Sequence, residues 1–277
     1  MCELLALSFS QSISARISLN KFQKRGDVNP DGWGVAFFDH NLLQLVKEPR
    51  SSVESRLFDF AETSITSDTI ISHVRRSTCG ERSYLNTHPF YRRFLHGGRV
   101  VEYAFAHNGT IQDVDCFVPE KYTPLGTTDS ERIFCYLLDR LAERNIAEWT
   151  TSDFRYLESE LNHINDGSNT MNCILSDGNY LFCYSDENDH NDGLRYAVRS
   201  SPFEIVRLTE RKGELGTVNL KHSTDNGGTE AFGLIVVTKA LTSTDWTELN
   251  PGELMVGKKG QVLYPEYRRN SQVSTEG

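Results

Sequence analysis

The sequence lacks a long apolar run and any extended cluster of positive charge. No stretch of its 277 residues approaches the about 20 consecutive apolar residues that span a bilayer. The N-terminal segment has neither a basic start nor a long apolar region, so it does not resemble a signal peptide. With a net charge of −9 and only short Lys/Arg clusters, the composition argues against a phosphate-backbone partner. We therefore expect a cytoplasmic protein that binds neither a membrane nor nucleic acid.

The cysteines lack the spacing of a metal or redox site. No two of them form a C-x-x-C pair, and a reducing compartment argues against a disulfide framework. We interpret most of them as small buried apolar residues. Cys2 is the exception, because it directly follows the initiator methionine. The six positions are Cys2, Cys79, Cys116, Cys135, Cys173 and Cys183.

Linkers, repeats and low-complexity segments are also absent, which favours a single domain. The chain is 38% hydrophobic and 24% charged, a composition that can bury a full core. We expect one domain over residues 1–265, followed by a mobile tail over 266–277. The polar stretches 185–193 and 222–229 are expected to be exposed loops.

Apolar patterning predicts strands on both sides of a helical pair. Residues 2–9 are apolar except for Glu3 and Ser8, as is typical of a strand covered on both faces, and residues 128–131 form a capping box that begins a helix. Strands, a helical pair and more strands predict an α+β fold with helices packed outside the sheets. Further expected strands are 35–39, 69–74, 101–106, 171–175, 180–184, 194–198, 203–208 and 232–238; one further helical face carries Phe154, Leu157, Leu161 and Ile164, and another carries Val53, Leu57 and Phe60.

Cys2 is a candidate nucleophile. Removal of Met1 would place the Cys2 thiol beside its own α-amino group. That amine has an unperturbed pKa of about 7.7–8.0, so near neutrality it can accept the thiol proton. A cysteine beside a start codon is a weak signal by itself, so the hypothesis depends on partner residues elsewhere in the chain.

Three further segments offer such partners, each with a structural alternative. The guanidinium of Arg75 suits a substrate carboxylate, although Arg75 and Arg76 could equally be a surface charge pair. Asn108 and Gly109 form a strong turn signal, but together they also supply two donors that could converge on an oxyanion. Asp129 favours the dipole of the helix that it begins, and a carboxylate in that place could also bind a substrate ammonium.

Several short segments, taken in their order along the chain, carry a family resemblance. They are Met1-Cys2, Asn29-Pro30-Asp31-Gly32-Trp33-Gly34, His73-x-Arg75-x-x-Thr78, Asn86-Thr87-His88-Pro89-Phe90, His107-Asn108-Gly109, Thr128-Asp129-Ser130-Glu131, Leu175-Ser176-Asp177-Gly178 and a pattern between Leu241 and Glu253. This ordered set resembles the class II glutamine amidotransferases of the N-terminal-nucleophile (Ntn) hydrolase superfamily, and within them the stand-alone subfamily. The ordered set is far more specific than any single member.

The resemblance implies a fold and a role for each matching residue. The fold is a four-layer αββα sandwich, with two stacked, mainly antiparallel sheets between helices. Cys2 would be the nucleophile and its α-amine the base, and Asn108 and Gly109 would form the oxyanion hole. Arg75 would bind the α-carboxylate of glutamine and Asp129 its α-ammonium. The substrate pocket would also involve Thr78, Asn86, His88, Trp33 and Gly34.

The reaction class follows from these roles, whereas the substrate stays open. The resemblance implies hydrolysis of the γ-amide of glutamine through a γ-glutamyl thioester, without a metal or organic cofactor. A γ-glutamyl peptide or amide is the alternative substrate, and a catalytically silent regulatory subunit is a further alternative. Because the sequence contains no G-x-x-x-x-G-K-[ST] phosphate loop and little follows residue 260, a separate synthase subunit would take any ammonia that is passed on.

The N-terminal-amine mechanism can be separated from an ordinary Cys–His hydrolase by the fate of Met1. A base at His73 or His107 would tolerate an uncleaved Met1, whereas the amine mechanism requires its removal. We expect protein that retains Met1 to release no glutamate from glutamine, and processed protein to release it. Intact mass gives the processing state and a glutamate assay gives the activity. Equal activity in the two forms would favour the histidine base.

Overall fold

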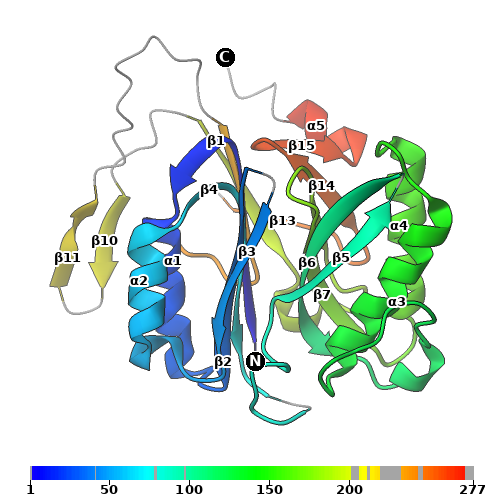
Figure 1. Ribbon diagram of the computed structural model, residues 1–277. Helices are drawn as coiled ribbons and strands as arrows, with labels where there is room; N and C mark the ends of the chain where they lie inside the picture. The colour runs from blue at the N-terminus through cyan, green and yellow to red at the C-terminus, as the bar shows by residue number, and fades with distance from the viewer. Residues whose placement is uncertain are drawn as a thin grey trace.

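The computed structural model describes residues 2–40, 42–77, 80–96, 98–200, 206–210, 213–218, 232–242 and 246–271. Two antiparallel sheets lie face to face, and helices cover the outer face of each (Figure 1). The first sheet has the strand order β13-β9-β12-β1-β4-β2-β3, and the second has the order β15-β14-β8-β7-β6-β5. This arrangement confirms the α+β class and the predicted four-layer αββα sandwich.

The element bounds are as follows. The first sheet contains β1 (Glu3–Ser14), β2 (Gly32–Asp39), β3 (Leu42–Glu48), β4 (Thr66–Arg75), β9 (Arg195–Ser200), β12 (Phe232–Val237) and β13 (Thr247–Glu248). The second contains β5 (Phe90–His96), β6 (Arg99–Thr110), β7 (Thr170–Ser176), β8 (Leu181–Tyr184), β14 (Leu254–Lys258) and β15 (Gln261–Tyr264), while β10 (Val206–Glu210) and β11 (Gly213–Val218) pair only with each other. The helices are α1 (Arg16–Gln23), α2 (Arg56–Ser64), α3 (Asp129–Arg144), α4 (Thr151–Ile164) and α5 (Glu266–Ser271), with 3-10 turns η1 (Lys24–Asp27), η2 (Ser52–Glu54), η3 (Val114–Cys116) and η4 (His190–Asp192).

Strand β1 is central to the first sheet and confirms the strand predicted at residues 2–9. It lies between β4 and β12 and is antiparallel to both. Because side chains alternate along a strand, Leu4 and Ala6 pack into the core between the two sheets. Leu5 and Leu7 pack into the core under α1 and α2. Both faces are buried, which accounts for the predominance of apolar residues in this run.

Helices α3 and α4 cover the second sheet as their patterns predicted. The Thr128 side chain accepts a hydrogen bond from the Glu131 N–H at 3.2 Å, which caps α3. Thr150 and Asp153 form a reciprocal capping box on α4. The four predicted apolar positions of α4 are all buried in the core beneath it: Phe154, Leu157, Leu161 and Ile164.

The predicted face of the helix after residue 50 was wrong. Leu57 is 40% exposed and Phe60 is 65% exposed, while Val53 lies in the preceding 3-10 turn. The buried face of α2 instead presents Phe58 and Ala61. The Phe58 ring packs edge-on against the ring of Trp33 in β2. This contact sets the rotation of α2 about its axis.

Two expected turn or loop regions also differ from their predictions. Residues 108 and 109 lie inside β6, paired with β7, so this Asn-Gly step is not a turn. The start of the loop 185–193 is buried rather than exposed, because the Asp186 carboxylate accepts hydrogen bonds from the N–H groups of Met171 and His190. The second predicted loop, 222–229, lies outside the described residues.

The boundary at residue 265 stays a prediction, although part of the predicted tail has defined structure. Residues Glu266–Ser271 form α5. Arg268 in this helix is 6% exposed and forms a bidentate ion pair with Glu253, with Nη2 and Oε2 at 2.5 Å. The helix is thereby attached to the second sheet at the start of β14.

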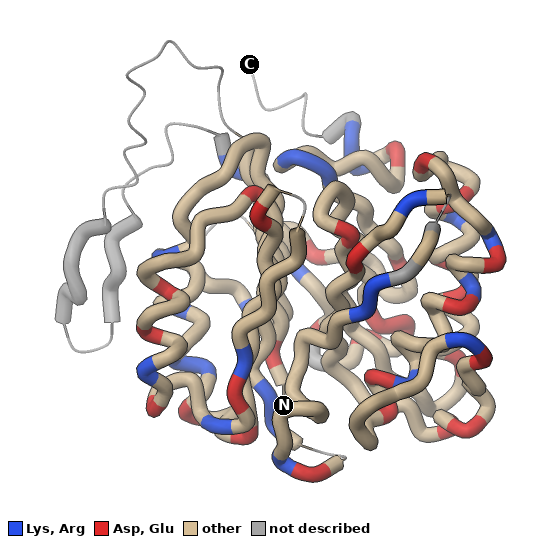
Figure 2. Tube along the Cα trace, viewed as in Figure 1, with Lys and Arg blue, Asp and Glu red and all other residues tan. Residues whose placement is uncertain are grey.

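Positions with charged residues of both signs are interspersed along the helices and the ends of the hairpins (Figure 2). Among the described residues, no helix is long and apolar enough to cross a membrane.

The buried pair of Glu253 and Arg268 makes a testable contribution to stability. Replacing Glu253 with Gln leaves the guanidinium of Arg268 buried without its counter-charge. We expect Glu253→Gln to lower the free energy of unfolding by about 3–5 kcal/mol, measured by urea denaturation. The matched control is Glu248→Gln, since Glu248 pairs with Arg195 while its side chain is 69% exposed. That change is expected to cost less than about 1 kcal/mol, and equal losses would contradict this account.

Candidate functional site

Cys2 is held at the end of β4 by the register of the first sheet. Glu3 lies opposite Val74 in the antiparallel pairing of β1 with β4. The residue before Glu3 therefore meets the chain just after β4. The Arg76 N–H donates to Cys2 Sγ at 3.1 Å, and Cys2 Sγ lies 3.2 Å from the Arg76 carbonyl.

The surroundings of the thiol oppose its ionisation. Burial raises the pKa of the Cys2 thiol, while the Arg76 N–H and the positive charge of Arg75 act in the opposite direction. In the described part of the chain, neither His73 nor His107 is hydrogen bonded to Cys2. A base for this thiol would therefore have to lie closer than either histidine.

Strand alternation directs several candidate side chains into the space between the sheets. Ala6 of β1, Ile71 of β4 and Ala106 of β6 belong to the inter-sheet core. Cys2, Arg75 and Asn108 lie an even number of residues from them, so they face the same space. Arg75 is only 3% exposed. Its Nη2 donates to the Gly80 carbonyl at 3.4 Å.

Asn108 joins the second sheet to the chain terminus. Its Nδ2 donates to the Cys2 carbonyl at 2.7 Å, and the side chain is 2% exposed. Gly109 follows where β6 and β7 approach closely, since a Cβ there would lie 2.0 Å from the Thr170 carbonyl oxygen. Only glycine fits this approach without a shift of β7. The structure thus brings Cys2, Asn108 and Gly109 together.

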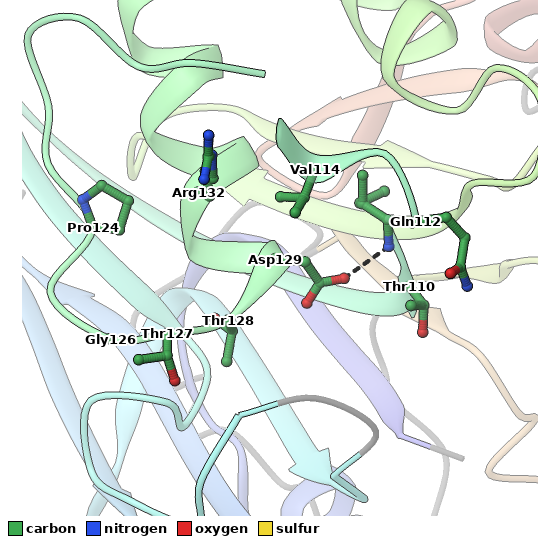
Figure 3. Close-up of a pocket in the computed structure, with 10 residues that line it drawn as sticks. Thr110, Gln112, Val114, Pro124, Gly126, Thr127, Thr128, Asp129 and Arg132 are labelled. Atoms are coloured by element: carbon green, nitrogen blue, oxygen red, sulfur yellow. Dashed lines mark hydrogen bonds between the residues drawn. The ribbon is translucent and has the colours of Figure 1, made fainter. Parts of the chain in front are cut away.

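Asp129 lies at the N-terminus of α3, beside the end of β6. Its Oδ2 accepts a hydrogen bond from the Ile111 N–H at 2.7 Å (Figure 3). It lines a cavity of about 390 Å³, whose walls include Thr110, Thr127 and Arg132. In Figure 3 the Asp129 carboxylate turns toward the chain after β6, whereas Arg132 points away from it. The half-buried carboxylate is therefore accessible from the cavity.

Asn86 connects the loop before β5 to the loop before α3. Its Oδ1 accepts from the Thr127 N–H at 2.8 Å, and its Nδ2 donates to the Glu81 carbonyl at 3.0 Å. A Cβ on Gly126 would lie 2.3 Å from Asn86 Oδ1, so glycine is required for this approach. Asn86 therefore holds the loop that leads into Asp129, and so it belongs to the same part of the structure.

His88 and Gly34 are packed together behind the site. A Cβ at position 34 would lie 2.2 Å from the His88 carbonyl oxygen, so glycine permits the contact. The His88 ring lies against the His73 ring, with centroids 4.3 Å apart and the ring planes tilted by 47°. Lys47 donates to the Thr87 carbonyl at 2.6 Å, and burial lowers its pKa to about 8. This packing fixes the loop that leads into β5.

The structure does not bring every predicted residue into this group. Trp33 is fully buried on the other face of the first sheet, with its ring 4.8 Å from that of Phe58. Thr78 lies outside the described residues. The roles assigned to individual side chains stay predictions, while the proximity of Cys2, Arg75 and Asn108 is a feature of the fold.

Sequence reasoning missed several residues that complete the site. The backbone of Arg76 contacts the thiol, and Asp31 Oδ2 accepts from the Ser77 N–H at 2.8 Å, which fixes the turn after β4. Ser130 bonds to a buried histidine and Lys47 supports the loop before β5. Ser130 was within reach, because it lies in the same four-residue segment as Asp129. Lys47 carries no local signal, since its partners are backbone carbonyls about 40 residues away.

No group of three or more His, Cys, Asp or Glu side chains in the described ranges is arranged to hold a metal ion.

A family model and two relatives match nearly the whole of this chain. The family model for class-II glutamine amidotransferases matches residues 1–276. The protein MJ1515 of Methanocaldococcus jannaschii is 36% identical over 97% of this chain and 72% of its own length. The putative glutamine amidotransferase YafJ of Escherichia coli is 29% identical, over 91% of this chain and 96% of its own.

Solved structures give the same result for the fold. A predicted glutamine amidotransferase from Pseudomonas aeruginosa superimposes with a TM-score of 0.68 at 29% identity, covering 95% of this chain and all of its own. The glutamine phosphoribosylpyrophosphate amidotransferase of B. subtilis has a TM-score of 0.61 at 13% identity, covering 95% of this chain and 48% of its own. At that identity the second match shows a common fold only.

The buried histidines make the stability of the protein dependent on pH. The ring nitrogens of His73 and His88 are buried and make no hydrogen bond within the described residues. Burial lowers the pKa of His73 to about 3, and the nearby charge of Arg75 adds to the effect. In the unfolded chain the same ring titrates near pH 6.5. The unfolded state therefore binds more protons below that pH, and stability falls as the pH drops toward 3.

We expect His73→Leu to lose about 2 kcal/mol less free energy of unfolding between pH 7 and pH 5 than the unchanged protein. Urea denaturation at the two pH values measures the difference. His40→Leu is the matched control, because the side chain of His40 is 94% exposed. An identical pH dependence in all three proteins would refute the account.

Proposed function

The chain belongs to the class-II glutamine amidotransferases, and on this premise we propose that it hydrolyses the γ-amide of glutamine through a γ-glutamyl thioester on Cys2, releasing ammonia and glutamate. The observation that carries the proposal is the position of Cys2. Its thiol contacts the backbone next to Arg75, and its carbonyl accepts from Asn108. A nucleophile, a carboxylate-binding cation and an oxyanion donor are therefore within reach of one small substrate.

The base for the thiol is proposed to be the α-amino group of Cys2, freed by removal of Met1. Burial raises the pKa of the thiol, so a free thiolate is disfavoured and deprotonation must accompany attack. The amine takes the proton as Sγ bonds to the γ-carbonyl carbon of the substrate. It then returns the proton to the departing nitrogen as the C–N bond breaks. Water hydrolyses the thioester, and the products are glutamate and ammonia.

The developing oxyanion would be stabilised by Asn108 and Gly109. The Asn108 amide group lies at the Cys2 backbone, where its Nδ2 donates to the Cys2 carbonyl. In the proposed reaction the Asn108 amide turns to the oxyanion, together with the Gly109 N–H. Each donor of this kind is worth about 3 kcal/mol of barrier.

Substrate choice would come from the two α-charges of the γ-glutamyl group. The buried guanidinium of Arg75 takes the α-carboxylate, and Asp129 takes the α-ammonium. Fixing both charges sets the distance to the reacting carbonyl, so only a γ-linked acyl group reaches the thiol. Any ammonia passed on would go to a separate synthase subunit.

A γ-glutamyl peptide or amide is the second candidate substrate. The cavity beside Asp129 has a volume of about 390 Å³, which lies within the range of about 300–1,000 Å³ that holds whole small-molecule ligands. This cavity is lined by Asp129 but not by Cys2, Arg75 or Asn108, so it offers room beside the proposed ammonium site rather than around the thiol.

The proposal predicts glutamate release that depends on Cys2. Glutamate would be assayed with L-glutamine and a panel of γ-glutamyl amides and peptides, after intact mass has verified Met1 removal. Cys2→Ala is expected to lower the rate by about three orders of magnitude or more. Cys116→Ala removes another thiol, which is exposed and lies in η3, and is expected to keep full activity.

Each result separates the alternatives. A preference for glutamine identifies a glutaminase, and a preference for a peptide or amide identifies a γ-glutamyl hydrolase. Activity that survives in Cys2→Ala would contradict the proposed nucleophile. Processed protein that releases no glutamate from any compound, with or without a synthase partner, would favour a silent regulatory subunit.

A further inference from the structure

His107 lies between the strand that carries Asn108 and the helix that begins at Asp129. It is 2% exposed and faces α3, because side chains alternate along β6. Its Nδ1 lies 2.8 Å from Ser130 Oγ, and its Nε2 lies 3.0 Å from the Thr170 carbonyl oxygen. The ring is therefore held at both nitrogen atoms.

The two contacts determine which nitrogen atom carries the proton. A carbonyl oxygen only accepts hydrogen bonds, so Nε2 of His107 must be protonated to bond to Thr170. In a neutral ring Nδ1 is then an acceptor, and within the described residues its donor is the Ser130 hydroxyl. The hydroxyl proton of Ser130 consequently points at His107.

This direction has a consequence for Asp129. Ser130 Oγ also lies 3.4 Å from Asp129 Oδ1. A hydroxyl has a single proton, so while it is donated to His107 it is not donated to Asp129. The other carboxylate oxygen, Oδ2, accepts from the Ile111 N–H. The lone pairs of Oδ1 thus stay available to a ligand in the cavity.

We infer that His107 and Ser130 are positioning residues that keep Oδ1 of Asp129 open for the α-ammonium group of the substrate. The inference rests on the proposed function, in which Asp129 binds that ammonium. In this arrangement Nδ1 of His107 accepts the hydrogen bond that the Ser130 hydroxyl would otherwise donate to Asp129 in competition with the substrate. The His107 ring is also hydrogen bonded to Thr170 of β7, and β7 pairs with β6, the strand that carries Asn108. One side chain therefore positions both the proposed ammonium-binding carboxylate and the proposed oxyanion donor.

The electrostatic surroundings of His107 keep the ring neutral. Burial lowers the pKa of His107, and the nearby His190 acts in the same direction. Asp129, the Thr170 carbonyl and Asp186 oppose the shift without cancelling it. The other titratable groups close to the ring are His73 and His88 between the sheets.

The test is a double-mutant cycle on glutamine binding. Kd for L-glutamine would be measured by calorimetry at pH 7.5 in Cys2→Ala protein, with His107→Leu, Ser130→Ala or both added. His107→Leu removes the acceptor, so the Ser130 hydroxyl turns to Asp129 and Kd is expected to rise about tenfold. Ser130→Ala alone, and the double variant, are expected to stay within about threefold of the parent.

Two controls separate this effect from a loss of structure. Glutaramate lacks the α-amino group, so its Kd is expected to be the same, within about twofold, in all four proteins. His107→Gln keeps one donor and one acceptor, and is expected to bind glutamine like the parent. A double variant no better than His107→Leu, or equal weakening of glutaramate, would overturn the inference.

A direct observation of the ring supports or overturns the inference without any variant at His107. Nitrogen-15 NMR of the histidine rings is expected to show His107 protonated at Nε2 and unprotonated at Nδ1 at pH 7.5. The opposite tautomer would overturn the inference. If the Cys2→Ala protein bound glutaramate but gave no added affinity for glutamine, the assignment of Asp129 would fail. If it bound neither compound, the proposed function itself would fail.

Discussion

The pairing of β1 with its two neighbours is the interaction on which the rest of the structure depends. Leu5 lies opposite Ser72 of β4 on one side and Val237 of β12 on the other. A chain end usually frays, but here it is hydrogen bonded on both edges and covered on both faces. The register then continues to Glu3, and this places Cys2, the residue before it, in contact with the chain at the end of β4. The position of the thiol is thus decided by the sheet and not by any local turn.

The parts of the fold that the sequence predicted well are those with a period or a cap. The mainly apolar run at residues 2–9 predicted a doubly buried strand, α3 carried a capping residue and a regular apolar stripe, and α4 was predicted from its apolar stripe alone. The face of α2 was wrong because apolar residues occur on both sides of this helix. Phe58 packs against Trp33 and is buried, whereas Phe60 is exposed. Such a choice depends on a partner in another element, which no local pattern contains.

The site shows the same division between local and long-range information. The residue types of Cys2, Arg75 and Asn108 are readable from the sequence, and strand alternation explains why they face one space. The Asn-Gly step was ambiguous, because its turn propensity is overridden by the pairing of β6 with β7. The buried start of the loop after β8 was missed for a similar reason. Its carboxylate at Asp186 looks solvent-exposed in the sequence, yet it accepts hydrogen bonds from two backbone N–H groups.

Asp129 illustrates how one side chain can serve the fold independently of the ligand-binding role that we propose for it. Its Oδ2 accepts the Ile111 N–H and so fastens the end of β6 to the start of α3, a task that has no connection with any ligand. A copy of this protein without the proposed activity would still be under selection to keep that carboxylate, because the fold uses it. Cys2 is different, since the hydrogen bonds of its thiol within the described ranges join it to the backbone of Arg76, just after a strand that is already fixed. When related sequences are sorted into active and inactive members, the acidic residue is therefore a marker of the architecture, and the cysteine is the informative one.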